Sequence, residues 1–139
     1  MTDNSLYKIA LTLIEGVGDV SAKNLVSYCG GVEEVFTASK KELSKVPGIG
    51  PKVVQAILKR DYFERAEAEL KFVEKNKIKV LFYFDPEYPK RLLNCPDSPA
   101  LLYYKGNADL NRQKVVSIVG TRKATEYGKY ITDKIIKDI

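Results

Sequence analysis

The stretches GVGDVSAKNLV (residues 16–26) and GIGPKVVQAIL (residues 48–58) decide how the first half of this chain folds. They align at an offset of 32 residues, and in each an aliphatic residue lies between two glycines. Another aliphatic residue follows seven positions after the second glycine, Leu25 in the first copy and Ile57 in the second. Self-similarity of this kind indicates a repeated supersecondary unit.

Each copy interrupts a helical pattern and resembles the helix-hairpin-helix motif. Glycine permits the positive φ of a tight hairpin, and the aliphatic residue between the glycines, Val17 or Ile49, is expected to fill the space between the two helices. The free N–H groups and positive dipole end of the second helix would then point outward, where a phosphate could bind. Residues 1–60 are therefore predicted to form an all-α, SAM-like domain with two hairpins.

The residue after each glycine pair differs between the two copies. In the first, Asp19 is expected to cap its own helix and to repel a phosphate, so this hairpin is interpreted as structural. In the second, Pro51 suits the first helical position and Lys52 adds a cation, which makes Gly48, Gly50 and Lys52 candidate DNA contacts. The alternative is that both hairpins only connect helices, since short glycine turns are common.

Periodicity and composition predict the other elements. Apolar residues at helical spacing predict helices over 5–14, 32–38 and 61–76, and Ser39 with Glu42 fits a capping box that begins another. β-branched and aromatic residues predict strands over 78–84, 101–105 and 115–119, and a last helix is predicted over 124–139. Tyr83, Tyr103 and Tyr104 are candidate stacking platforms for bases, with half-buried strand residues as the default interpretation.

Composition excludes several classes of function. The chain has 139 residues, a net charge of +5, two cysteines and no histidine, so histidine triads, a disulfide framework and most zinc sites are excluded. No metal or cofactor is expected. No apolar run is long enough to cross a bilayer, and no signal peptide is evident, so cytoplasm is the default location and no membrane partner is expected. Residues 105–139 carry a net +4, which permits but does not prove polyanion binding.

The second half carries marks of a specific family. The chain resembles the DNA-processing protein A family (DprA, also called Smf) over essentially its whole length. The marks are Tyr88-Pro89 with Leu92, the 99–106 segment with LYYKG, and Ile118-Val119-Gly120 followed by Arg122, Thr125, Tyr127 and Gly128.

The resemblance implies a bacterial single-stranded DNA-binding protein that is not an enzyme. It would protect incoming strands in natural transformation and load the RecA recombinase onto them. The implied fold is α+β overall, with the helical domain at 1–60, a connecting helix at 61–77 and the incomplete first part of an extended Rossmann-like domain at 78–139. The family's homodimer contact is expected to lie outside this chain, which looks like an N-terminal fragment.

The resemblance also assigns a role to the loop after the predicted third strand. The family's Gly-Ser-Arg motif corresponds to Gly120-Thr121-Arg122, with threonine in place of serine. Backbone N–H groups and the start of the next helix would form an anion site, Arg122 would add a charged fork for a DNA phosphate, and Lys123 and Thr125 complete the candidate site. The alternative is that Arg122 is an ordinary surface residue.

Two other functions remain open. Rossmann-like folds with such a loop also occur in nucleotide-processing hydrolases of the lysine-decarboxylase-like group, although that alternative does not explain the hairpin repeat. The helical domain could instead be a protein-interaction module with purely structural hairpins. In either case we expect the helical domain to fold well. The last helix is expected to lack packing, with poor order or intermolecular strand pairing as the consequence.

Overall fold

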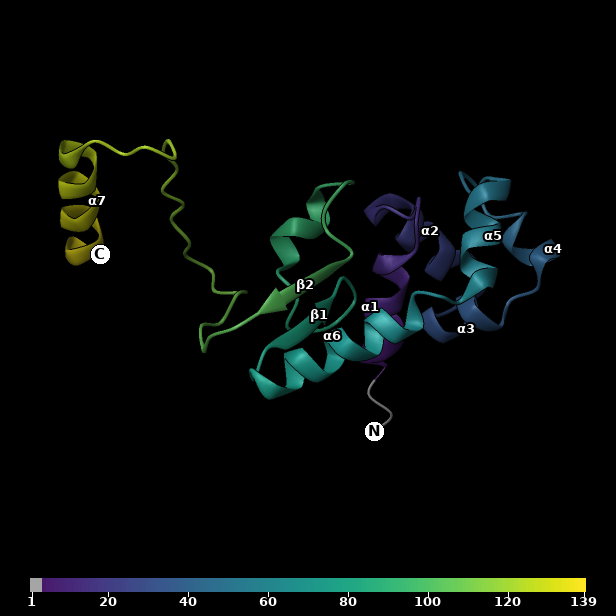
Figure 1. Cartoon of the computed structure of the whole chain (residues 1–139). Helices are drawn as coiled ribbons and strands as arrows, with labels where there is room; N and C mark the ends of the chain where they lie inside the picture. The colour runs from purple at the N-terminus through teal and green to yellow at the C-terminus, as the bar shows by residue number, and fades with distance from the viewer. Residues whose placement is uncertain (1–3) are drawn as a thin grey trace.

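The first part of the molecule is a compact group of helices (Figure 1). The computed structural model describes residues 4–139 of the chain. The helices are α1 (Ser5–Leu13), α2 (Asp19–Cys29), α3 (Val32–Thr37), α4 (Lys40–Leu43), α5 (Pro51–Lys59) and α6 (Phe63–Lys75). These confirm the helices predicted from periodicity. The capping box is also confirmed, because the Ser39 and Glu42 side chains each bond the backbone N–H of the other residue.

The two hairpins share one backbone geometry, and only the first glycine of each pair uses a positive φ. Gly16 has φ +81° and Gly48 has φ +79°, a backbone region that residues other than glycine rarely adopt. The second glycines, Gly18 and Gly50, are extended N-caps of α2 and α5 with φ −94° and −84°. Pro51 is the first residue of α5, as predicted.

A two-stranded antiparallel sheet follows the helices. Strand β1 (Lys79–Phe82) pairs with β2 (Leu101–Tyr104), with Phe82 opposite Leu101. The proline-rich connection between the strands contains a short 3₁₀ helix, Lys90–Asn94. With α7 (Glu126–Asp138) at the end of the chain, the described residues have the α+β fold class that the sequence predicted.

One hydrophobic core joins the helices to the sheet. The buried cluster contains Ile9 from α1, Leu25 from α2 and Ile57 from α5, and it extends to Phe82 of β1 and to Ala100, the residue before β2. In Figure 1, α6 lies below the sheet and crosses in front of α1. The sheet therefore rests on the helical domain through packed side chains as well as through the chain connection.

The predicted third strand is wrong for this chain. Residues 115–119 form no strand, and all of them are exposed, with Val119 at 91%. A segment that is apolar on both faces becomes a stable strand only between neighbouring strands and covering helices, and no strand among the described residues pairs with it. Helix α7 forms as predicted but buries no residue, and Figure 1 shows it standing apart from the rest of the molecule.

Candidate nucleic-acid interface

The second hairpin leaves the start of α5 open. Gly50 is the N-cap and provides no side chain to accept from the first N–H groups, and Pro51 has no N–H of its own. Ile49 is buried between the helices, as predicted, while Lys52 is exposed. Backbone donors and a cation thus face solvent together, which is the chemistry that binds a phosphate.

Several lysines lie near this hairpin in the sequence. Lys40 and Lys41 lie on α4, Lys45 follows it, and Lys59 lies near the end of α5; all are exposed. No ion pair within residues 4–139 involves any of these lysines. Lys59 and Lys52 also line a pocket of about 400 Å³ that contains one carboxylate, that of Glu15. These lysines therefore take no part in an ion pair among the described residues, although Glu15 and Glu42 lie among them.

The first hairpin differs, and one prediction about it is wrong. Asp19 does not cap α2, because the described helix start has no side-chain cap. The Asp19 carboxylate instead accepts a hydrogen bond of 2.7 Å from the backbone N–H of Ala100. On the next turn, the Lys23 ammonium donates to the carbonyl oxygen of Ser98 at 2.5 Å and to its hydroxyl at 2.8 Å. The start of α2 thus faces the chain's own segment before β2.

The loop of the expected Gly-Thr-Arg site is exposed. Thr125 is the N-cap of α7, and its hydroxyl accepts a hydrogen bond of 3.1 Å from the N–H of Gly128. The Thr121 hydroxyl donates to the carbonyl oxygen of Lys123 at 2.9 Å. Arg122 and Lys123 are both exposed, and neither takes part in an ion pair with a described residue.

The structure does not bring the candidate DNA residues together. Gly48, Gly50 and Lys52 belong to the start of α5, whereas residues 120–125 precede α7, and these two helices lie at opposite ends of the molecule in Figure 1. Without a paired strand before it, Gly120 does not form the tight strand-to-helix turn that the resemblance implies. A DNA molecule that contacts both groups at once would therefore have to reach from one end of the molecule to the other.

The candidate stacking tyrosines are mostly engaged in contacts inside the chain. The Tyr103 hydroxyl donates to the Glu69 carboxylate at 2.5 Å, and burial together with this bond raises the pKa of Tyr103. The Tyr104 hydroxyl donates to the carbonyl oxygen of Ala108. The Lys23 ammonium lies 5.8 Å from the centre of the Tyr83 ring, and burial raises the pKa of Tyr83. These contacts favour the half-buried interpretation for Tyr83 and Tyr104, whereas Tyr103 is 44% exposed.

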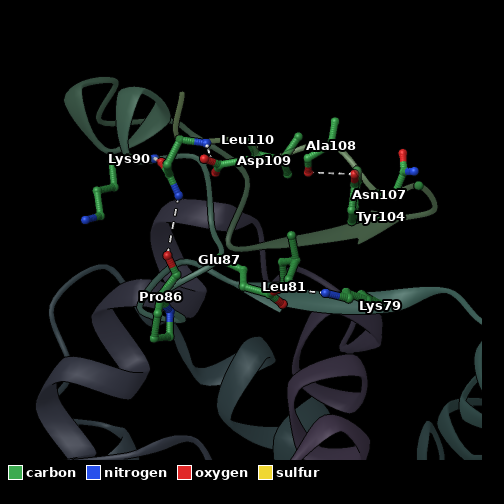
Figure 2. A pocket seen from close by; sticks show the side chains of 12 residues that line it. Lys79, Leu81, Pro86, Glu87, Lys90, Tyr104, Asn107, Ala108, Asp109 and Leu110 are labelled. Atoms are coloured by element: carbon green, nitrogen blue, oxygen red, sulfur yellow. Dashed lines mark hydrogen bonds and ion pairs between the residues drawn. The ribbon is translucent and has the colours of Figure 1, made fainter. Parts of the chain in front are cut away.

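Sequence reasoning missed one pocket. It has a volume of about 450 Å³ and lies between the outer face of β1–β2 and the loop after β2 (Figure 2). The Asn111 amide builds its wall by donating to the carbonyl oxygens of Pro86 and Tyr88 and accepting from the N–H of Lys90. The only signal in the sequence was the polar turn at 107–113. Its walls mix charges, since Lys79 pairs with Glu87 at 2.6 Å, so it lacks the positive character of a DNA groove.

Two other kinds of site are not found in the described part of the chain. No group of three or more cysteines, aspartates or glutamates is placed to hold a metal ion within residues 4–139. No helix in that range is both long enough and apolar enough to cross a membrane.

Two family models match successive parts of the chain. Residues 8–60 match a model described as a SAM-like helix-hairpin-helix tandem. Residues 79–139 match a model described as DNA recombination-mediator protein A. The two matches follow each other in the order that the sequence motifs predicted. No solved structure matches the chain.

Individual relatives agree with these matches. Protein Smf from Synechocystis is 32% identical over 93% of this chain and 33% of its own length. DNA processing protein DprA from Streptococcus pneumoniae is 33% identical over 60% of this chain and 29% of its own. UvrABC system protein C from Yersinia pseudotuberculosis is 44% identical over 34% of this chain but only 8% of its own.

The chain spans about one third of the length of the Smf and DprA relatives that it matches. The Smf match nevertheless extends across both the helical part and the sheet, and both family models lie in the expected order. The chain therefore belongs to the DprA/Smf family of DNA-processing proteins.

Proposed function

We propose that this chain takes part in DNA processing as the N-terminal part of a cytoplasmic recombination mediator that binds single-stranded DNA. Its role would be binding and not catalysis. In the full-length protein the partners would be single-stranded DNA, the RecA recombinase and a second copy of the protein. The observation that carries the proposal is the exposed Arg122–Lys123 pair next to α7, inside the segment that matches DNA recombination-mediator protein A.

The chemistry of that pair supports a phosphate contact. Arginine presents a planar, permanently charged fork that fits phosphate oxygens, and residues 105–139 carry most of the chain's positive excess. Thr125 satisfies only the N–H of Gly128 among the first N–H groups of α7, which leaves Gly120, Thr121 and Lys123 beside an open helix start. Assembly of this loop into a groove would need strand partners for residues 115–119.

The second hairpin is proposed as a separate, weaker contact. Its open helix start and nearby lysines give a sequence-independent attraction for phosphates, carried by Gly48, Gly50 and Lys52. The same geometry also suits a protein-interaction module whose partner is acidic. Substitution of Lys52 distinguishes the two, because unchanged affinity for DNA would favour the interaction module.

The experiment is fluorescence anisotropy of labelled oligo-dT across a salt series, with this chain and with a full-length version. Arg122→Ala is expected to lower affinity by about three- to tenfold and to make the salt dependence shallower by about one phosphate contact. Lys134→Ala, which removes an exposed positive charge from α7 and leaves the loop at 120–125 intact, is the matched control. If Arg122→Ala binds as the parent does, the loop is not the DNA site and a nucleotide-processing role gains support.

A further inference from the structure

The first hairpin has a built contact where the second is open. Asp19 at the start of α2 accepts from the N–H of Ala100, and Lys23 on the same face donates to Ser98. These partners are separated by 81 and 75 residues in the sequence. Ser98 and Ala100 are buried, whereas Asp19 is exposed and Lys23 is half-buried, so the contact lies at the edge of the junction between the helices and the sheet.

We propose that the first hairpin is an internal docking site: the start of α2 holds the chain's own Ser98–Ala100 segment and thereby fixes the helical domain to the β-sheet. The two copies of the repeated motif therefore have different roles. The first hairpin binds a backbone segment of the same chain, whereas the helix start after the second hairpin is open to solvent.

The chemistry of the contact fits a peptide backbone better than a phosphate. Asp19 supplies a negative acceptor for an N–H group, and Lys23 supplies a positive donor for a carbonyl oxygen. Together they bind one backbone donor and one backbone acceptor of the segment that leads into β2. Hydrogen bonds with one charged partner are stronger than neutral ones. A phosphate has only acceptor oxygens and would meet the Asp19 carboxylate as a like charge.

The segment is held from its other side as well. The hydroxyl of the buried Tyr88 donates to the carbonyl oxygen of Pro99 at 2.6 Å. The carbonyl oxygen of Ala100 accepts from the N–H of Tyr83, just after β1. Successive backbone groups of residues 98–100 are thus tied alternately to α2 and to the connection that follows β1, so rotation of one part against the other would break several bonds together.

A second pair of contacts lies beside the first. The Lys8 ammonium of α1 pairs with the Asp85 carboxylate at 2.9 Å and lies 5.9 Å from the centre of the Phe82 ring. Asp85 also accepts from the N–H of Phe82. This contact holds the end of β1 against α1. The junction between the helices and the sheet thus combines buried apolar side chains, such as Phe82, with polar contacts at their edge.

The test is amide hydrogen exchange of the 139-residue chain, read residue by residue by NMR. In Asp19→Ala the Ala100 amide is expected to exchange at least about tenfold faster, because it loses its charged acceptor. Asp19→Asn keeps an acceptor oxygen at the same place and should restore much of the protection. Lys23→Met retains the apolar stem but loses the bond to Ser98. The Tyr83 amide, which donates to Ala100 in the same segment, should then exchange faster, while the Val54 amide of α5 stays unchanged.

Glu64→Ala is the matched control, because Glu64 is an acidic residue in the first turn of another helix. It removes a favourable charge near a helix start without touching the junction, so Ala100 exchange should not respond. The proposal is overturned if Ala100 exchanges at the parent rate in Asp19→Ala, or if Glu64→Ala has an equal effect. Because no DNA is present, neither result bears on the proposed DNA-binding function.

Discussion

The hydroxyl of Tyr62 donates a hydrogen bond of 2.7 Å to the carbonyl oxygen of Ile57, and only 6% of this residue is exposed. Burial raises the pKa of Tyr62 to about 12 from the usual value of 10.0, because the phenolate would lose its hydration. The neutral phenol is the form that the folded state favours. Its contribution to stability is therefore fully present below about pH 10 and is lost as the pH rises through about 12.

Tyr62→Phe is therefore expected to make the alkaline fall in the free energy of unfolding shallower between about pH 10 and 12. The ring remains, so its contacts with Phe36 and Phe63 remain too. Urea unfolding at a series of pH values measures this slope. Tyr127→Phe, at a residue that is 74% exposed, should keep the parent slope. An unchanged slope in Tyr62→Phe would show that this phenol does not control the alkaline transition.

The first glycines of the two hairpins, Gly16 and Gly48, can be compared directly because they occupy the same position of the repeat. Gly16 and Gly48 have nearly the same positive φ, +81° and +79°. A Cβ at Gly48 would meet nothing within 4 Å, whereas one at Gly16 would lie 3.1 Å from the Cγ2 atom of Val53. Gly48→Ala is expected to cost about 1 kcal/mol for the backbone alone. Gly16→Ala should cost about 2 kcal/mol or more, because crowding between the hairpins is added.

Urea unfolding of the two variants gives both values directly. Gly120→Ala is the control, since Gly120 has open space around its Cα and no positive φ, and it should be nearly neutral. Equal costs at Gly16 and Gly48 would mean that Val53 moves aside freely and that the two hairpins are not tightly packed against each other.

Local signals in the sequence predicted most of the elements. The repeated glycines, Pro51 and the Ser39–Glu42 capping box act within a few residues, so each could be recognised without knowledge of the fold, and the structure confirms them. The strand predicted at 115–119 failed for the opposite reason. Its composition suits a strand, but a strand exists only if another strand lies beside it, and that depends on distant parts of the chain.

The candidate site shows the same division. Exposure of Lys52 and the open start of α5 follow from the local sequence, and the structure shows both. The role of Asp19 could not be read in this way, because its partner Ala100 lies 81 residues further on. A carboxylate at a helix start predicts a local cap, and only the tertiary fold supplies the competing N–H group.

At the scale of the whole molecule, the chain consists of a packed body and an extended tail. The core runs from α1 to β2 without interruption, and the loop after β2 is tied down as far as residue 113, where the Arg91 guanidinium donates to the carbonyl oxygens of Arg112 and Gln113. Beyond that point no residue is buried. Lys114, Val116, Ile118, Ile136 and Ile139 line an apolar pocket within the tail itself.

Removal of residues 114–139 is therefore expected to leave the thermal midpoint and the cooperativity of unfolding unchanged, because stability comes from buried surface that the tail does not provide. The same truncation should reduce self-association, since it removes exposed apolar side chains such as Val116, Val119 and Ile136. Thermal unfolding and analytical ultracentrifugation of the 139- and 113-residue chains test the two points separately. A lower midpoint in the shorter chain would mean that the tail packs on the body, and the loop at 120–125 would then lie against a surface instead of standing free of one.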